Sequence, residues 1–149
     1  MEDCTFRSNR ATETGGAIAL FENAHFSAKR STFQNCTSQS GGALFAKENS
    51  KIVMGDCTIQ LNNAISTGGA VFLANYAELK VESSLFHQNE APQGGAFYVQ
   101  QEGSLLIQNC TISNNQSPSG LGGAVNSQNL AIIKVTSTFF LVTCCSRTC

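Results

Sequence analysis

The hydrophobic positions of this chain recur with a period of 26–28 residues, and each period begins at the tripeptide Gly-Gly-Ala. An aliphatic or aromatic residue follows every copy, namely Ile18, Leu44, Val71, Phe97 and Val125. A second apolar position, which we call the anchor, comes 18 residues after the first glycine of each copy, at Phe33, Ile59, Phe86, Ile112 and Phe140. A fixed period of this size predicts a stack of similar units rather than an ordinary globular fold.

Each period is predicted to contain three short strands. The first strand follows Gly-Gly, and the third ends at the anchor. The second strand alternates, with an inward pair of apolar residues separated by one residue, as expected for a strand with one buried face. These pairs are Phe26 and Ala28, Ile52 and Met54, Leu79 and Val81, Leu105 and Ile107, and Ile133 and Val135. All variation in length lies between the anchor and the next Gly-Gly, which predicts a rigid coil with one adjustable loop.

Strands joined by such short turns predict a parallel β-helix, because no segment of a coil buries its apolar face without a neighbouring coil. We therefore expect an all-β solenoid of about five coils over residues 1–142. Residues 143–149 form a tail that fits no repeat and contains three of the seven cysteines. The start Met1-Glu2-Asp3 does not resemble a signal peptide, and we expect the chain to be a fragment of a longer solenoid.

Two sets of residues are predicted to have structural roles. The glycine pairs are expected to supply a positive φ angle or a close backbone approach before the first strand; they are Gly15 and Gly16, Gly41 and Gly42, Gly68 and Gly69, Gly94 and Gly95, and Gly122 and Gly123. Asparagine stands three residues after the anchor in most periods, at Asn9, Asn62, Asn89 and Asn115, and Cys36 replaces it once. An asparagine there suits a left-handed corner leaving the strand, and stacked copies can form an amide ladder.

The motifs Gly-Gly-Ala-aliphatic and Phe-x-x-Asn alternate in one period, for example at residues 6–9 with 15–18 and at residues 86–89 with 94–97. In this the chain resembles the polymorphic membrane protein repeat of chlamydial outer-membrane autotransporters, and similar repeats in surface proteins of other bacteria and some protists. The resemblance covers nearly all of residues 3–142. It implies a right-handed, single-stranded parallel β-helix of the pectate-lyase type. It also implies a cell-surface, outer-membrane or extracellular location, and a role as an adhesin or structural passenger.

Composition narrows the classes of partner. The formal net charge is −1, and no basic cluster extends beyond Lys29-Arg30, so we expect no binding to nucleic acid or anionic membranes. No apolar run approaches the length of a membrane-spanning helix. Cys4, Cys57 and Cys110 fall at one repeat position two coils apart, about 9–10 Å from one another, which is beyond disulfide reach.

Catalytic chemistry has one weak candidate. Polysaccharide lyases and hydrolases also use parallel β-helices, and they need carboxylates that converge on one face. Glu22 and Glu48 fall at the same position of adjacent coils, roughly 5 Å apart. They would make a weak metal site or an acid–base pair, but a solvated loop edge is the simpler interpretation. We therefore assign no catalytic residue and expect no cofactor, and a polysaccharide-active enzyme remains the alternative.

A binding surface is the other candidate. Phe45, Phe72 and Tyr98 share the position beside the inward residue of the first strand, so they are predicted to form an exposed aromatic stripe. The alternative is that this column belongs to the core. The expected partners are a host or neighbouring-cell protein or a surface glycan, and self-association through open solenoid ends. The sequence thus favours a non-enzymatic surface segment acting in adhesion or as a structural spacer.

Overall fold

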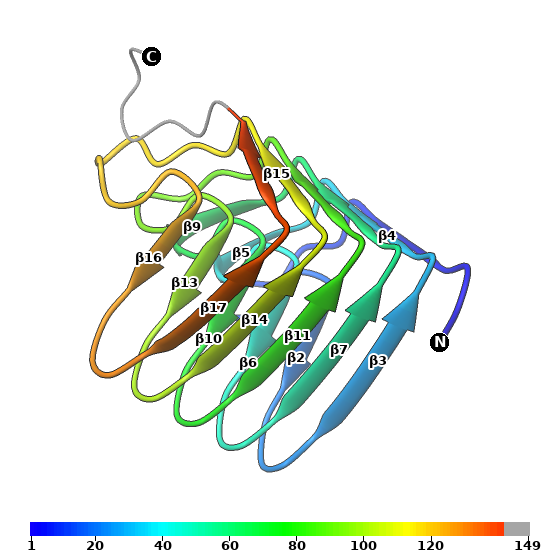
Figure 1. Ribbon diagram of the computed structural model, residues 1–149, viewed down its shortest axis with the longest axis horizontal. Coiled ribbons are helices and arrows are strands. Elements are labelled where there is room, and N and C mark those ends of the chain that lie inside the picture. Colours follow the sequence, from blue (N-terminus) through cyan, green and yellow to red (C-terminus); the bar gives the residue numbers. More distant parts are fainter. Residues whose placement is uncertain (142–149) are drawn as a thin grey trace.

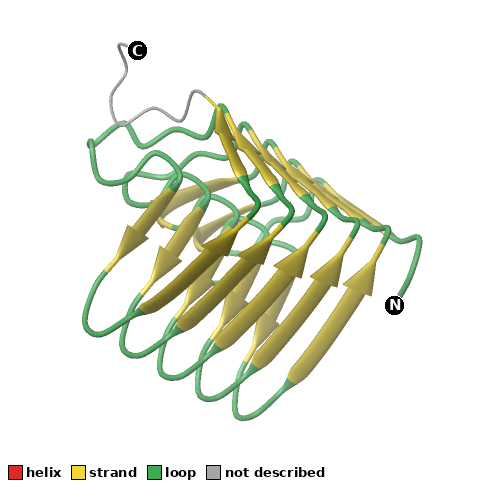
Figure 2. Cartoon of the chain, in the orientation of Figure 1, coloured by secondary structure: helices red, strands yellow, loops and turns green. Residues whose placement is uncertain are grey.

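Each sequence period forms one coil, and the coils stack side by side from the N-terminal to the C-terminal end of a parallel solenoid (Figure 1). The computed structural model describes residues 1–141, and their regular elements are short β-strands joined by turns (Figure 2). The all-β solenoid predicted from the sequence is therefore confirmed. The tail at residues 143–149 lies outside the described residues.

Three parallel sheets run along the axis, each built from one strand per coil. The first sheet follows the Gly-Gly pairs and contains β2 (Ile18–Leu20), β6 (Leu44–Ala46), β10 (Val71–Leu73), β13 (Phe97–Val99) and β16 (Val125–Ser127). The second contains β3 (His25–Lys29), β7 (Lys51–Gly55), β11 (Glu78–Glu82), β14 (Ser104–Gln108) and β17 (Ile132–Thr136). The third carries the anchors and contains β1 (Thr5–Arg7), β4 (Thr32–Gln34), β8 (Thr58–Gln60), β12 (Leu85–His87), β15 (Thr111–Ser113) and β18 (Phe139–Leu141).

The strand register pairs the residues that are equivalent in the sequence repeat. Phe33 lies opposite Ile59, which lies opposite Phe86, and the inward positions of the first sheet pair in the same way. Identical positions therefore form straight columns inside the solenoid. The predicted inward residues of all three sheets make one continuous core, although Val135 and Phe140 in the last described coil are 39% and 45% exposed.

The two glycines of each pair have different roles. The first glycine has a positive φ in every copy, between +55° and +73°, as glycine alone tolerates easily. At Gly16, Gly42, Gly69 and Gly95 the backbone leaves no room for a side chain, because a Cβ atom would overlap the carbonyl oxygen of the second glycine in the next coil. Both predicted reasons for glycine are thus confirmed, one at each position.

The predicted amide ladder is present in the middle of the solenoid. The Nδ2 group of Asn62 donates to Oδ1 of Asn89 at 3.0 Å, and Asn89 donates in the same way to Asn115 at 3.0 Å. Each Nδ2 also donates to an anchor carbonyl one coil back, as Asn89 does to Ile59 at 3.0 Å. The ladder is weaker at Cys36, because the Nδ2 group of Asn9 meets the Cys36 sulfur there at 3.8 Å instead of an amide oxygen.

The prediction that these asparagines adopt the left-handed conformation is wrong. Positive φ angles fall one residue earlier in each coil, at Ser8, Asn35, Leu61, Gln88 and Asn114. The turn made there directs the following side chain into the coil, where Asn62, Asn89 and Asn115 are buried. The asparagine is needed for its amide rather than for its backbone.

The segment between the anchor strand and Gly-Gly, which we call the variable segment, is more regular than the predicted loop. Strands β5 (Thr37–Ser40) and β9 (Asn63–Thr67) pair in parallel, with a register shift between Ser38 and Ser40 that absorbs a difference in length. Isolated bridges continue this ladder to the neighbouring coils. A column of small residues packs inward beneath it, at Ala11, Ser38, Ala64, Ala91 and Ser117, and this column was not recognised in the sequence.

Replacing Asn89 by alanine is predicted to lower the free energy of unfolding by about 3 kcal/mol, because neighbouring buried groups lose their hydrogen-bond partners. Urea denaturation measures this change. The control Gln108→Ala, on the outer face of the second sheet, should change it by less than about 0.5 kcal/mol. Equal effects of the two substitutions would contradict a stabilising role for the ladder.

The glycine column provides a matched pair of substitutions. Gly42→Ala is predicted to prevent folding or to cost at least about 4 kcal/mol, since the new methyl group overlaps backbone of the next coil. Gly55→Ala adds a methyl group whose nearest neighbour is Cγ of Lys29 at 3.9 Å, so it should stabilise the protein by about 0.5 kcal/mol. Circular dichroism with thermal melting compares the two, and a Gly42→Ala protein as stable as the wild type would refute the close approach.

Candidate functional site

The aromatic column of the first sheet is buried, so the predicted exposed stripe is wrong. Phe45, Phe72 and Tyr98 are only 7%, 8% and 5% exposed. They face away from the main core, as predicted, but they form a second apolar cluster with Ala74. The orientation was therefore right and the exposure was not.

Stacking in register explains part of this burial. The rings of Phe45 and Phe72 lie 4.7 Å apart and nearly parallel, and Tyr98 continues the stack at 5.5 Å. The next member of the column, Asn126, donates its Nδ2 to the carbonyl of Leu121 at 3.2 Å, so a side chain at this position reaches back across the Gly-Gly corner. Burial also raises the pKa of Tyr98.

The equivalent of Phe45 in the preceding coil is Ala19, and beside this end of the column Phe21 tilts against Phe45 with 5.6 Å between ring centroids. Phe21 is 39% exposed, and the ammonium group of Lys47 lies 5.2 Å from its ring centroid. Of these four rings, Phe21 is therefore the one exposed to a partner.

Glu22 and Glu48 lie on stacked turns, as their register predicts. The amide of Asn23 donates to the carbonyl of Glu48 at 2.8 Å. The Glu48 carboxylate pairs with Lys47 at 3.0 Å, and no third acidic, His or Cys side chain joins a metal-binding group anywhere in residues 1–141. Among the described residues, no other side chain therefore joins Glu22 and Glu48 as a metal ligand.

The turns that carry these glutamates have a feature the sequence analysis missed. Both central residues have positive φ in every coil, including Glu22 and Asn23, Glu48 and Asn49, Asn75 and Tyr76, Gln101 and Glu102, and Asn129 and Leu130. Asparagine occurs at one of the two positions in four of these five turns. Because asparagine tolerates a positive φ, its recurrence could have predicted this backbone conformation from the sequence. The backbone conformation therefore accounts for the asparagines of these turns.

Four cysteines lie among the described residues, and all have free thiols, as predicted for the three that share a column. Cys57 and Cys110 alternate along this column with Ser84. The Oγ of Ser84 accepts a hydrogen bond from the backbone amide of Cys57 at 3.0 Å. Burial raises the pKa of both cysteines. Their environment is that of structural thiols.

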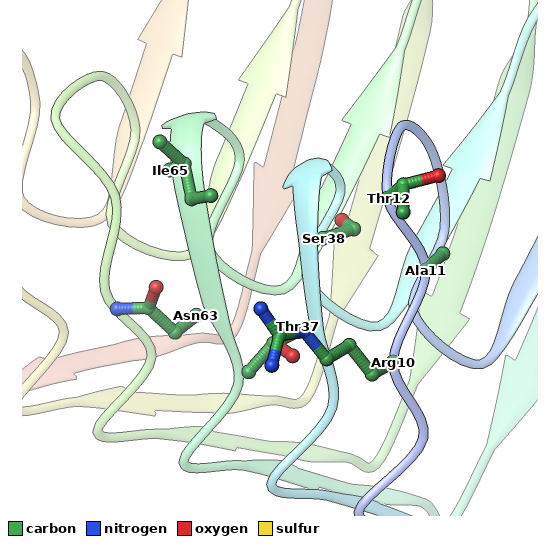
Figure 3. Close-up of a pocket in the computed structure, with 7 residues that line it drawn as sticks. All are labelled: Arg10, Ala11, Thr12, Thr37, Ser38, Asn63 and Ile65. Atoms are coloured by element: carbon green, nitrogen blue, oxygen red, sulfur yellow. The ribbon is translucent and has the colours of Figure 1, made fainter.

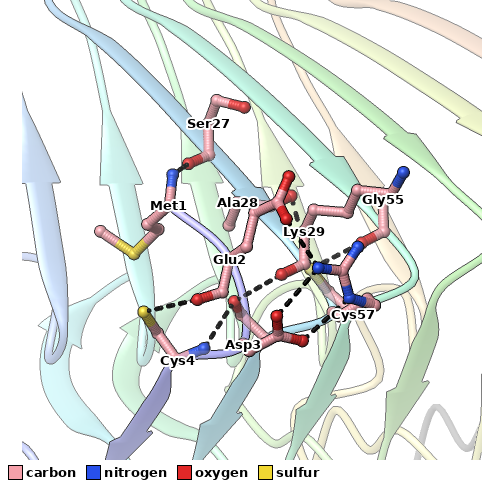
Figure 4. Close-up of polar contacts among 11 residues, drawn as sticks. Met1, Glu2, Asp3, Cys4, Ser27, Ala28, Lys29, Gly55 and Cys57 are labelled. Carbon is pink, nitrogen blue, oxygen red and sulfur yellow. Dashed lines mark hydrogen bonds and ion pairs between the residues drawn. The ribbon is translucent and has the colours of Figure 1, made fainter.

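A charged cluster at the N-terminal edge was also missed. Arg30 donates from Nε and one terminal nitrogen to the two carboxylate oxygens of Asp3, at 2.9 and 2.8 Å, and contacts Glu2 at 2.6 Å. This hydrogen bonding lowers the pKa of Asp3. Figure 4 shows Met1, Glu2 and Asp3 lying against the end of β3, where the Met1 amino group donates to the Ser27 carbonyl at 2.8 Å. The cluster attaches the first residues to the next coil.

The outer surface of the variable segment is the remaining candidate, and the sequence analysis did not propose it. A hollow of about 400 Å³ is lined by Arg10, Ala11, Thr12, Thr37, Ser38, Asn63 and Ile65 (Figure 3). A second hollow, of about 210 Å³, is lined by Leu61, Gln88, Asn89, Glu90, Asn114 and Gln116. Both are shallow and lined by polar and apolar side chains together, and these side chains come from consecutive coils.

Comparison with known proteins supports the fold. A family described as "Right handed beta helix region" matches residues 1–139, which confirms the predicted handedness. No curated protein and no solved structure matches the chain. Within residues 1–141, no helix is long and apolar enough to cross a membrane.

The burial of the aromatic column predicts that Phe72→Ala destabilises the protein by about 3 kcal/mol, which corresponds to a fall in Tm of about 10 °C for a chain of this size. Val53→Ala is the control, since Val53 is 49% exposed on the second sheet, and its Tm should stay within about 2 °C of the wild type. A Phe72→Ala protein with the same Tm as the wild type would show that the stripe is exposed.

Proposed function

Because the chain belongs to the right-handed β-helix family, we propose that it is a rigid, non-enzymatic segment of a surface-exposed or secreted protein. It acts in adhesion, with the solenoid serving as a structural spacer that displays an outer face. The family contains no fixed chemistry of its own, since fold alone does not specify function. The proposal therefore depends on how the side chains of this chain are used.

The observation that supports it is the composition of the interior. The buried polar side chains of the described residues are all uncharged: Ser31, Ser38, Ser50, Asn62, Ser84, Asn89, Ser113, Asn115 and Ser117. Each is hydrogen-bonded, and none of the buried polar side-chain atoms of residues 1–141 is left without a partner. Their partners are mostly neighbouring backbone and equivalent residues in the next coil, so these groups stabilise the stack.

No Asp, Glu, Lys or Arg side chain of residues 1–141 is buried, and these charged groups are dispersed over the outside. Arg30 pairs with Glu2 and Asp3, and Lys51 pairs with Glu78 at 3.2 Å. Acid–base catalysis on a glycosidic bond requires two carboxyl groups that flank one substrate position and differ in pKa. Glu22 and Glu48 share one position of adjacent coils, and the Glu48 carboxylate is already paired with Lys47. These contacts favour display over catalysis.

The repeat motifs support the surface location. Gly-Gly-Ala-aliphatic and Phe-x-x-Asn alternate through the chain as they do in the polymorphic membrane protein repeats that the chain resembles. We accordingly propose that the chain is the passenger part of such a surface protein, with a host or neighbouring-cell component as its partner.

The purified chain is predicted to bind to the surface of intact cells, and antibodies raised against it are predicted to label its source cells without permeabilisation. Flow cytometry measures both. The chain should also release no reducing ends from a panel of plant, bacterial and animal polysaccharides above the level of the double variant Glu22→Gln/Glu48→Gln. Activity that disappears in this variant would overturn the non-enzymatic proposal, and labelling only after permeabilisation would overturn the surface location.

A further inference from the structure

We propose that the outer face of the variable segments binds a neutral oligosaccharide chain that lies along the solenoid axis. This inference rests on the proposed function, because it gives the adhesive surface a place and a ligand class. The face is defined by two outward columns. One contains Arg10, Thr37, Asn63, Glu90 and Gln116, and the other contains Thr12, Gln39, Ile65, Pro92 and Pro118.

The register of the ladder makes the first column continuous. Arg10 is bridged to Thr37, Thr37 pairs with Asn63, Asn63 is bridged to Glu90, and Glu90 to Gln116. Each step is one coil, about 4.8 Å along the axis. The column therefore presents one polar side chain at regular intervals over five coils.

Both hollows of this surface lie along that column. Arg10, Thr37 and Asn63 line the larger hollow, and Glu90 and Gln116 line the smaller one. Figure 3 shows Arg10, Thr37 and Asn63 on one side of the larger hollow, with Thr12 and Ile65 on the other. Between the two sides lie Ala11 and Ser38 of the small inward column, which lack bulk to fill the space. The result is a furrow in two parts that follows the axis.

The chemistry of the furrow fits a sugar chain. Hydroxyl and amide groups of Thr37, Asn63 and Gln116 can each donate and accept hydrogen bonds, as the hydroxyl groups of a sugar require. Beside them Ile65 and Leu61 are 67% and 42% exposed, and such apolar side chains suit the C–H faces of sugar rings. Polar groups at fixed positions next to apolar surface are the usual composition of a small-molecule site.

Charge selects a neutral chain over a polyanion. The column carries one positive group at Arg10 and one negative group at Glu90, so its formal charges cancel. A polyanion attracted to Arg10 would meet Glu90 three coils further on. Binding should for this reason depend little on ionic strength, in contrast to binding through exposed charges.

The test uses an array of neutral hexasaccharides of glucose, galactose, mannose and N-acetylglucosamine, with hyaluronan and heparin fragments as anionic probes. The wild-type chain is expected to bind at least one neutral hexasaccharide, with similar affinity at low and physiological salt. The double variant Thr37→Ala/Asn63→Ala is expected to bind it at least about tenfold more weakly. The control Ser104→Ala/Gln108→Ala, on the outer face of the second sheet, is expected to bind like the wild type.

Several results would overturn the proposal. Binding to heparin or hyaluronan alone, equal losses in the two double variants, or no binding to any neutral hexasaccharide would overturn the proposal. Unchanged melting temperatures of both variants exclude a loss through misfolding. If the chain adheres to cells and Thr37→Ala/Asn63→Ala adheres equally well, the furrow is not the adhesive site while the proposed function stands. If the wild-type chain does not adhere at all, the proposed function itself fails.

Discussion

Hydrogen bonding between successive coils is the interaction on which the whole structure depends. Backbone amides of one coil donate to carbonyls of the next, as Gly42 does to Gly68 and Leu61 to His87, both at 3.0 Å. These bonds hold equivalent residues about 4.8 Å apart, so a residue type repeated in the sequence becomes a column in space. Glycine is required in the second position of the first four pairs because two backbones meet there without room for a Cβ atom.

Stacking in columns explains why equivalent buried side chains stabilise one another and why the buried polar residues carry no charge. A buried side chain meets its own equivalent above and below, which suits amides and aromatic rings but places like charges side by side. Asn62, Asn89 and Asn115 satisfy one another and the anchor carbonyls, and Phe45 and Phe72 stack face to face. Charged residues are consequently found on the outside, and the binding that we propose is assigned to an outward column, that of Thr37 and Asn63.

The sequence predicted those features that recur in every coil with the same residue type. The coil length, the inward columns, the glycine roles and the amide ladder all follow from strict periodicity. The burial of Phe72 was not predictable in this way, because it depends on neighbouring segments of the coil as well as on its own strand. The left-handed positions were missed because Ser8, Leu61 and Gln88 share no residue type, and the ladder of the variable segment was missed because its length differs between coils.

Some contacts depend on a single pair of residues and leave no periodic signal at all. Arg30 binds Asp3 and Glu2, but the equivalent position in the other coils is not arginine. The furrow is a similar case, since its columns mix hydroxyl, amide and charged residues. Features of this kind come from three-dimensional register, and the structure is needed to find them.

Hydrogen exchange measured by NMR on the native protein tests the central claim most directly. The backbone amides of Asn62 and Asn89 donate to the side-chain oxygens of Asn89 and Asn115 at 3.1 and 3.0 Å. If coil-to-coil bonding through the ladder holds the structure together, these amides exchange only through global unfolding, together with the strands of the three sheets. The amide of Gly120, which donates within its own turn to Ser117, should exchange much faster. Exchange of Asn62 and Asn89 at the rate of Gly120 would contradict the account.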